Sequence, residues 1–123
     1  MANFAEIQNG IVVRIVVISN DDIKDENGIE QEKFGIQLCN ELVGPANWIQ
    51  TSFNNNFRKQ YGDMGFTYDP NADVFIRPRP YPSWLLNENY DWRPPIPMPN
   101  DDNNYWWDED HLCWSLIIET EES

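Results

Sequence analysis

Residues 4–19 read FAEIQNGIVVRIVVIS, and they carry the clearest structural pattern in the chain. Two runs of apolar and β-branched residues flank Asn9-Gly10, the dipeptide that is preferred in a two-residue type I′ hairpin turn. The pattern predicts antiparallel strands at about 3–7 and 11–18. Val and Ile make up nearly all of the second run, which is typical of a strand that is buried on both faces or lies in the middle of the sheet.

One helix is predicted at about 29–42 from the apolar spacing that follows the hairpin. Glu30 and Glu32 would lie in its first turn, where the helix dipole favours negative charge, and Gly44 and Pro45 form a common helix stop. We expect this to be the only helix and its apolar stripe to cover one face of the sheet. The stripe has i, i+4, i+8 spacing and consists of Phe34, Leu38 and Leu42.

A third strand is predicted in NWIQTSF at 47–53, and a short phrase then repeats along the rest of the chain. The three copies are YDPNADVF at 68–75, LNENYDW at 86–92 and WDEDHLCW at 107–114. Each has Asp, Asn or Pro in its middle, as turns do, and ends on a large aromatic ring. Each copy therefore predicts a β-hairpin with an aromatic staple across it, and such a hairpin has little stability in isolation.

Seven of the nine prolines fall in residues 78–99, PRPYPSWLLNENYDWRPPIPMP. Proline cannot donate to a sheet ladder, so we expect these connections to be extended and polyproline-like. They could stack on tryptophans of the same chain or lie across a neighbouring subunit. Aromatic rings and flexible apolar chains dominate interface energies. The predicted partner-binding residues are Tyr81, Trp84, Trp92, Ile96, Met98 and Trp106.

The predicted fold class is α+β: a small antiparallel β-sheet with one helix, followed by β-hairpins and extended proline-rich connections. A chain of 123 residues is long enough for one hydrophobic core. We therefore expect a single domain over 1–123. Within it, 1–66 would form the α+β core and 67–123 a region of hairpins and proline arms.

The charge of the chain argues against nucleic acid as a partner. Acidic residues number 21 against eight Lys and Arg, which gives a net charge of −13 that phosphate would repel. Five of the basic residues gather in the middle third, either to balance charge within the fold or to meet an acidic neighbour or a second copy. They are Arg58, Lys59, Arg77, Arg79 and Arg93.

Membrane insertion and secretion are not expected. The longest apolar stretch, at 11–18, is interrupted by Arg14 and is far shorter than a bilayer span, which takes roughly 20 residues. The first ten residues lack the basic and apolar regions of a signal peptide. Cys39 and Cys113 each lie in an apolar stretch without a Cys-x-x-Cys spacing, so we expect two free, buried thiols in a protein made in the cytoplasm.

Residues for catalysis or metal binding are not apparent in the sequence. His111 is the single histidine and falls in the third predicted turn, where a solvated side chain is the simplest interpretation. Cys39, Cys113 and His111 lack the short spacings of zinc ligands. An EF-hand beginning at Ile23 would place Phe34 at its twelfth position, and neither residue binds calcium. We therefore expect no catalytic residue, no metal and no cofactor.

The order of phrases along the chain is similar to a poorly characterised group of small proteins from marine cyanophages and related tailed phages. The shared phrases are WIQTS, YDPNADVFIRPRPYPSW, a Trp followed by Pro-Pro, and WDED with a final Trp. The resemblance covers nearly the whole chain and implies a place in the virion after synthesis in the host cytoplasm. It supplies no catalytic residues.

Three functions are consistent with these observations. The leading hypothesis is a non-enzymatic phage structural protein, most simply one that decorates the capsid or another particle surface and contacts capsid or tail subunits or other copies of itself. An early acidic phage protein that binds a host protein, by imitating the charge of DNA, is an alternative. A tail, neck or fibre component that binds carbohydrate through exposed aromatic rings is another.

Overall fold

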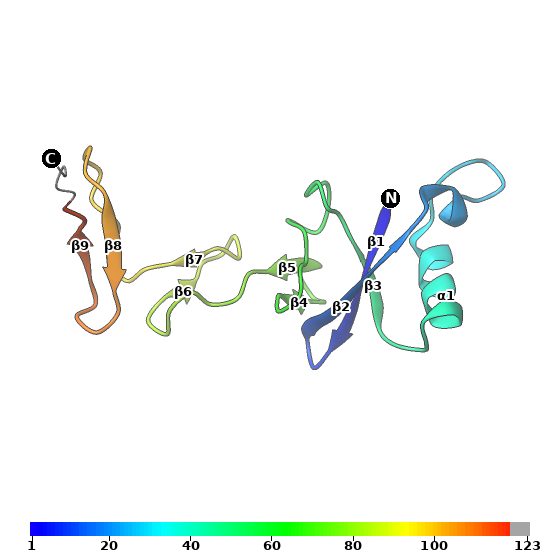
Figure 1. The fold of residues 1–123 in the computed structure, drawn as a ribbon, viewed down its shortest axis with the longest axis horizontal. Helices are drawn as coiled ribbons and strands as arrows, with labels where there is room; N and C mark the ends of the chain where they lie inside the picture. Colours follow the sequence, from blue (N-terminus) through cyan, green and yellow to red (C-terminus); the bar gives the residue numbers. More distant parts are fainter. Residues whose placement is uncertain (119–123) are drawn as a thin grey trace, which may run out of the picture. The chain divides into compact units, whose positions relative to one another are not determined.

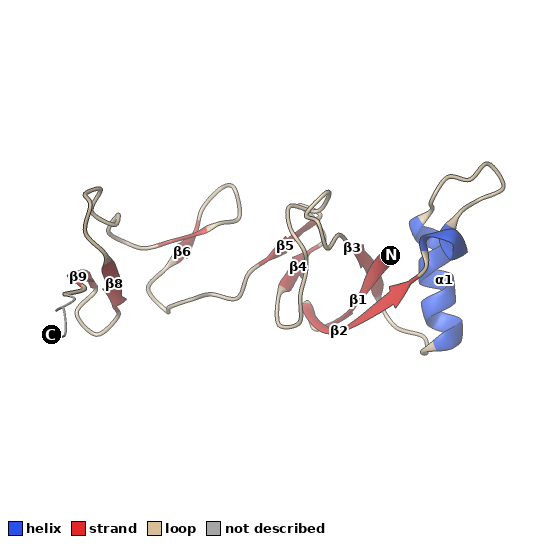
Figure 2. Ribbon diagram, turned by 45° about the horizontal axis from the view of Figure 1, so that its top comes forward, coloured by secondary structure: helices blue, strands red, loops and turns tan. Residues whose placement is uncertain are grey.

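The computed structural model describes residues 1–118 and divides the chain into two compact units, Met1–Pro78 and Arg79–Ser123. Figures 1 and 2 show strands in both units, with long loops between those of the second, and α1 in the first unit; the paired strands are antiparallel. The fold is thus broadly α+β, as predicted. The unit boundary lies after Pro78, so the first predicted hairpin belongs to the first unit.

A five-stranded antiparallel sheet forms the first unit, with strand order β3-β1-β2-β4-β5. The strands are β1 Ala2–Gln8, β2 Ile11–Ile18, β3 Trp48–Thr51, β4 Thr67–Asp69 and β5 Val74–Ile76. β1 and β2 form the predicted hairpin, and Asn9 and Gly10 have φ values of 54° and 80°. Positive φ at both turn residues is what a type I′ turn requires, which confirms the predicted connection.

The second strand, β2, is the middle strand of the five, which was one of the two predicted alternatives. The other alternative was wrong, because β2 is not buried on both faces: Ile11, Val13 and Val17 are exposed. β4 pairs with β2 at one end only, through Ile11 and Thr67, so the outer edge of β2 is left uncovered over much of its length. An apolar run therefore indicates a central strand here without ensuring that both of its faces are buried.

The helix α1 is Glu32–Leu42, so it begins three residues later than predicted, and a short 3-10 helix, η1 Asn20–Ile23, precedes it. Glu30 lies outside the helix, in an isolated β-bridge with Lys24. Gln31, between this bridge and the helix, has extended backbone angles, so the helix begins only at Glu32. α1 is the one α-helix among residues 1–118, as predicted, and η1 is a 3-10 helix of four residues.

The buried face of α1 also differs from the predicted stripe. Gly35 and Cys39 are its buried residues, whereas Leu42 is 75% exposed. Phe34 and Leu38 are half-buried at the edges of a core cluster made of Ala2, Phe4, Ile18, Ile23, Cys39 and Trp48. Small residues on the inner face let the helix lie close to the sheet, a pattern that a search for large apolar residues misses.

The opposite face of the sheet is covered by the segment that leads to β5. Phe75 is fully buried there and packs with Ala5, Ile7 and Val12. Tyr68 stands opposite Phe75 across the β4–β5 hairpin, with ring centroids 5.2 Å apart, so the predicted aromatic staple is present. The sheet therefore has an apolar cluster on each side.

Arg58 links the start of α1 to the β4–β5 hairpin through its side-chain hydrogen bonds. Its guanidinium donates through Nη1 to Glu32 Oε2 at 2.8 Å and to the Gln50 carbonyl at 2.9 Å, and through Nε to Asp73 Oδ1 at 2.7 Å. Burial lowers the pKa of Arg58, but its hydrogen bonds to Glu32 and Asp73 raise it more, so the net pKa lies above its ordinary value. At Arg58, one of the five basic residues of the middle third, the positive charge therefore balances acidic residues of the same unit, as one of the two explanations had it.

Two hairpins make up the second unit as far as residue 118. They are β6 Leu85–Leu86 with β7 Trp92–Arg93, and β8 Tyr105–Asp108 with β9 Cys113–Leu116. Trp107 pairs with Trp114 across the last hairpin, as predicted, whereas Leu86 rather than a second ring stands opposite Trp92. The proline segments on either side of β6–β7 have no regular secondary structure, and their polyproline-like conformation stays a prediction.

Candidate partner-binding site

A cluster of three tryptophans connects the parts of the second unit. Trp107 and Trp114 have ring centroids 5.2 Å apart, and the Trp84 ring meets their rings edge-on at 6.1 and 6.2 Å. Trp84 lies just before β6, so the cluster joins this segment to the β8–β9 hairpin. Edge-to-face packing of this kind stabilises by about 0.5–1.5 kcal/mol per pair beyond area burial.

Glu109, in the turn of that hairpin, reinforces the cluster through polar contacts. Its carboxylate accepts hydrogen bonds from the Ser83 hydroxyl at 2.6 Å, the Ser83 N–H at 3.2 Å and the Trp107 indole at 2.9 Å. The hydrogen bond from the Ser83 side chain, followed by that from Trp107, lowers the pKa of Glu109. The turn is thereby fixed to the residue next to Trp84.

The proline segment after β7 is joined to β9 by a hydrogen bond from a tryptophan side chain. The Trp114 indole donates to the Ile96 carbonyl at 2.8 Å. This bond spans 18 residues and holds the segment beside β9. One side chain thus belongs both to the tryptophan cluster and to the anchor of the proline segment.

These contacts leave an open apolar pocket of ≈ 480 Å³, which we call the tryptophan pocket. Its volume lies in the range of pockets that hold small ligands or a few side chains, about 300–1,000 Å³. Trp92 and Arg93 come from β7, and the rest from the flanking segments and β9. The pocket is lined by Trp84, Trp92, Arg93, Pro94, Pro97, Met98 and Trp114.

Arginines lie beside this apolar surface. The Arg79 guanidinium stands over the Trp92 ring at 4.8 Å from its centroid, and Arg93 is exposed at the pocket itself. A cation over an indole face is a favourable arrangement, worth about 0.5–1 kcal/mol at an exposed site. Tryptophan and arginine are also the residues that most often dominate binding at protein interfaces. Two of the eight basic residues of a chain with net charge −13 thus lie at this surface.

Trp84 has one unsatisfied group. Its buried indole N–H has no hydrogen-bond partner among residues 1–118. Leaving a buried donor unpaired costs about 1–3 kcal/mol.

Three of the six predicted partner-binding residues line the tryptophan pocket, and two more lie next to it. Trp84, Trp92 and Met98 line the tryptophan pocket, and the Tyr81 ring packs beside Trp84 at 5.6 Å. Ile96 has an exposed side chain and contributes its carbonyl to the Trp114 bond. This places five of the six predicted residues at the pocket or next to it.

Trp106 is the exception. It pairs with Ser115 across β8–β9, and strand alternation directs its side chain to the opposite face from Trp107. Its ring is 50% exposed. Sequence reasoning missed Trp114, which was assigned to a staple alone. The regular hairpin spacing indicated its cross-strand partner but not the pocket on its other side.

No protein-family model, curated protein or solved structure matches the chain. The tryptophan pocket is therefore interpreted from its own geometry.

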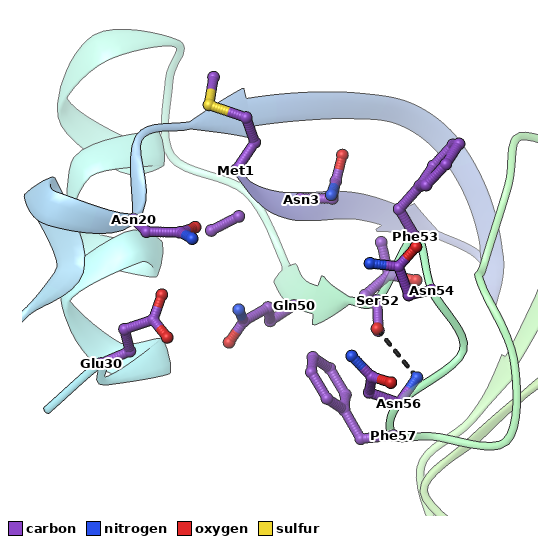
Figure 3. A pocket seen from close by; sticks show the side chains of 12 residues that line it. Met1, Asn3, Asn20, Glu30, Gln50, Ser52, Phe53, Asn54, Asn56 and Phe57 are labelled. Atoms are coloured by element: carbon purple, nitrogen blue, oxygen red, sulfur yellow. Dashed lines mark hydrogen bonds between the residues drawn. The ribbon is translucent and has the colours of Figure 1, made fainter.

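A second, polar pocket of ≈ 240 Å³ lies in the first unit (Figure 3). Two exposed rings, Phe53 and Phe57, stand at its β3 end, and Asn20 and Glu30 lie across from them. Between them the lining is rich in side-chain amides: Asn3, Gln50, Asn54 and Asn56. Within this pocket the Ser52 hydroxyl accepts the Asn56 N–H at 3.0 Å.

Other candidate groups lie apart from both pockets. His111 is exposed in the β8–β9 turn and pairs through Nδ1 with Asp108 at 2.7 Å, a contact that raises the pKa of His111. Cys39 and Cys113 are free thiols, as predicted, but only Cys39 is buried and Cys113 is half-buried. Burial raises the pKa of Cys39. Over residues 1–118, three or more His, Cys, Asp or Glu side chains nowhere gather as metal ligands would, and no helix has the length and apolarity of a bilayer span.

Proposed function

We propose that this protein is a non-enzymatic structural component of a phage particle, and that it binds a capsid or tail subunit through the tryptophan pocket. The observation that carries the proposal is the gathering of Trp84, Trp92, Trp114 and Met98 around one open apolar pocket. Large rings in a preformed pocket supply binding energy with little loss of side-chain freedom. The resemblance to phage proteins supports the location of the partner.

The chemistry of the site favours a protein segment as the partner. The lining is apolar, and Arg79 and Arg93 add positive charge beside it. A partner segment with an apolar or proline side chain for the pocket and a nearby carboxylate for the arginines would fit this arrangement. Capsid decoration is the simplest such role, and attachment to the tail or neck uses the same contacts.

Incorporation into particles tests the proposal. Phage lacking the gene is grown in cells that supply either the parent chain or a variant, and copies per purified particle are counted by quantitative mass spectrometry. Met98→Glu places a charge in the apolar pocket at an exposed residue, so we expect its copy number to fall at least tenfold. Trp92→Ala should have a similar effect. Near-UV circular dichroism checks that each variant is folded.

Leu85→Ala is the matched control because Leu85 is an exposed apolar residue of the same unit outside the pocket. Its copy number should equal that of the parent chain. Absence of the parent chain from purified particles would refute the virion role, and synthesis early in infection would instead favour the host-protein alternative. Loss of Met98→Glu and Leu85→Ala to the same extent would refute the role of the pocket.

Carbohydrate binding is a second candidate function, favoured by the polar pocket of the first unit. Exposed Phe53 and Phe57 rings beside several amide side chains combine a stacking surface with hydrogen-bonding groups. A glycan array probed with the parent chain and with Phe53→Ala tests it. Binding that Phe53→Ala abolishes supports a tail or fibre role, and an array without signal refutes it.

A further inference from the structure

The outer edge of β2 has no neighbouring strand between Arg14 and Ile18. The bond from Val12 N–H to the Phe66 carbonyl, at 2.8 Å, is the last backbone contact toward β4. Beyond it, β2 pairs only with β1 among residues 1–118. An uncovered edge of this kind is a template for another strand.

The register identifies which backbone groups are open. The Ile7 N–H donates to the carbonyl of Asn47, the residue just before β3, at 2.8 Å. The backbone N–H and C=O groups of Ile7 therefore point toward β3. Strand alternation makes Ala5 and Asn3 face β3 as well. Their partners in β2 are Ile15 and Val17, which therefore direct their N–H and C=O groups away from β1.

The side chains along this edge lack the features that normally prevent association. Val17 is 50% exposed, and Ile15 and Val16 are half-buried on opposite faces of the sheet. Natural edge strands are usually protected by charged side chains, proline, a β-bulge or a covering loop. The register shift in this hairpin falls at Val13, which lies just outside the open stretch from Arg14 to Ile18. The one charged side chain here is Arg14, which is held by Glu6 through its Nε at 2.9 Å.

We propose that two copies of the chain pair through this edge, β2 against β2 and antiparallel, with the twofold axis at Val16. In this register Ile15 of each copy stands opposite Val17 of the other. Each of these two equivalent pairs exchanges both N–H···O bonds, which satisfies every open group identified above. The result is one continuous sheet across the dimer.

The open edge of β2 can pair with the same edge of a second copy because its donors and acceptors are arranged symmetrically about its centre. The edge is bounded on one side by the Val12 contact and on the other by Asn20, where η1 begins. Val16 lies at its centre, so the pattern of donors and acceptors is self-complementary about a twofold axis. The two Arg14 side chains would lie at opposite ends, each across from Ile18, and like charges do not face each other.

The interface joins β-branched side chains on one face of the sheet. Ile15 and Val17 lie on the same face as the cluster around Phe75, so pairing extends that apolar cluster to the partner copy. Cross-strand pairs of such residues contribute about 0.2–1 kcal/mol each. This dimer is independent of the proposed function, and it would carry two tryptophan pockets.

The mass of the full chain in solution tests the proposal. Light scattering is measured over a range of concentrations up to about 1 mM chain, where even a weak specific dimer with a Kd near that value is well populated. Salt at about 0.5 M screens the repulsion between two chains of net charge −13. We expect twice the chain mass for the parent and the single mass for Val17→Lys. Leu42→Lys, at another exposed apolar residue of the same unit, should stay dimeric.

Amide hydrogen exchange provides a second readout that does not depend on a variant. Arg14 and Val16 direct their N–H groups to β1, so their amides should be protected at every concentration. The amides of Ile15 and Val17 should exchange at least tenfold more slowly at high concentration than at low. A single chain mass at every concentration overturns the proposal. So does a dimer that Val17→Lys leaves intact, or protection of both amides in a monomer.

Discussion

Gly35 of α1 lies directly against the ring of Phe4 in β1. A Cβ atom at Gly35 would stand 1.9 Å from Cζ of Phe4, and the Phe4 side chain is completely buried. Two heavy atoms cannot approach so closely, so the helix touches the sheet through its own backbone. This contact sets the separation of the two layers.

Gly35→Ala should therefore destabilise the first unit. Overpacking of a buried site usually costs about 1–3 kcal/mol, and the higher helix propensity of alanine offsets up to about 1 kcal/mol of this. Because the approach to Phe4 is so close, the cost should lie in the upper part of that range, and we expect a net fall in the free energy of unfolding of about 1–2 kcal/mol. Urea denaturation with far-UV circular dichroism measures it. Gln37→Ala, on the exposed side of the same helix, should change it by less than about 0.5 kcal/mol. A stabilised Gly35→Ala would contradict the close approach.

Arg58 predicts a larger effect from the loss of one side chain. Its guanidinium, 17% exposed, serves Glu32, Asp73 and the Gln50 carbonyl together. Arg58→Met would remove the positive charge from between Glu32 and Asp73, which keep only their hydrogen bonds from the Gln50 N–H and the Tyr68 hydroxyl. The expected loss is about 2–4 kcal/mol of unfolding free energy in urea. Lys24→Met is the control, because its ion pair with Asp21 is exposed to solvent and contributes little to stability. If the two variants lost the same free energy of unfolding, the joint contact of Arg58 with three acceptors would not be the source of its stabilising effect.

The local elements could be predicted from the sequence where short-range chemistry determines them. Asn9-Gly10 requires positive φ at both residues, and this fixes the β1–β2 hairpin. Likewise, the spacing of Tyr68 and Phe75 and of Trp107 and Trp114 placed each pair in register across a hairpin. These contacts join residues that are close in the sequence, so the local residue pattern is enough to predict the hairpin and its register.

Contacts between distant segments could not be predicted in the same way. The inner face of α1 rests on Gly35 and Cys39 because the ring of Phe4 fills the space between the layers. Similarly, the exposed edge of β2 depends on where residues 63–67 happen to join it, at Val12 rather than further along. The tryptophan pocket required Trp114 and Met98 to meet across residues that the sequence separates. Composition indicated the aromatic anchors but not their arrangement.

Acid should weaken the first unit through Asp73. The hydrogen bond from the Tyr68 hydroxyl, followed by that from Arg58, lowers the pKa of Asp73 below its usual range. A carboxyl whose pKa is lower in the folded state contributes stability above about pH 4, and this is lost as the pH falls through the folded value. Urea denaturation at pH 7 and pH 3 should show the loss.

Asp73→Asn tests the origin of this pH dependence. Asp73 has a φ of 58°, a conformation that asparagine tolerates well, so the backbone should be preserved. The variant should be less stable than the parent at pH 7 and should lose less stability between pH 7 and pH 3. An unchanged difference between the two pH values would assign the acid sensitivity to other carboxyls, such as Glu6.

Glu109 should control the tertiary structure of the second unit without affecting the first. Its carboxylate holds both Ser83 and the Trp107 indole, so Glu109→Ala removes the acceptor that fixes the β8–β9 turn to the segment containing Trp84. Because five of the six tryptophans lie after residue 78, near-UV circular dichroism reports mainly on this unit. We expect a weaker near-UV signal and a lower urea midpoint for that signal. Asp110→Ala, at an exposed residue of the same turn, should leave both unchanged. A parallel loss of the far-UV signal of α1 in Glu109→Ala would contradict the assignment of this contact to the second unit alone.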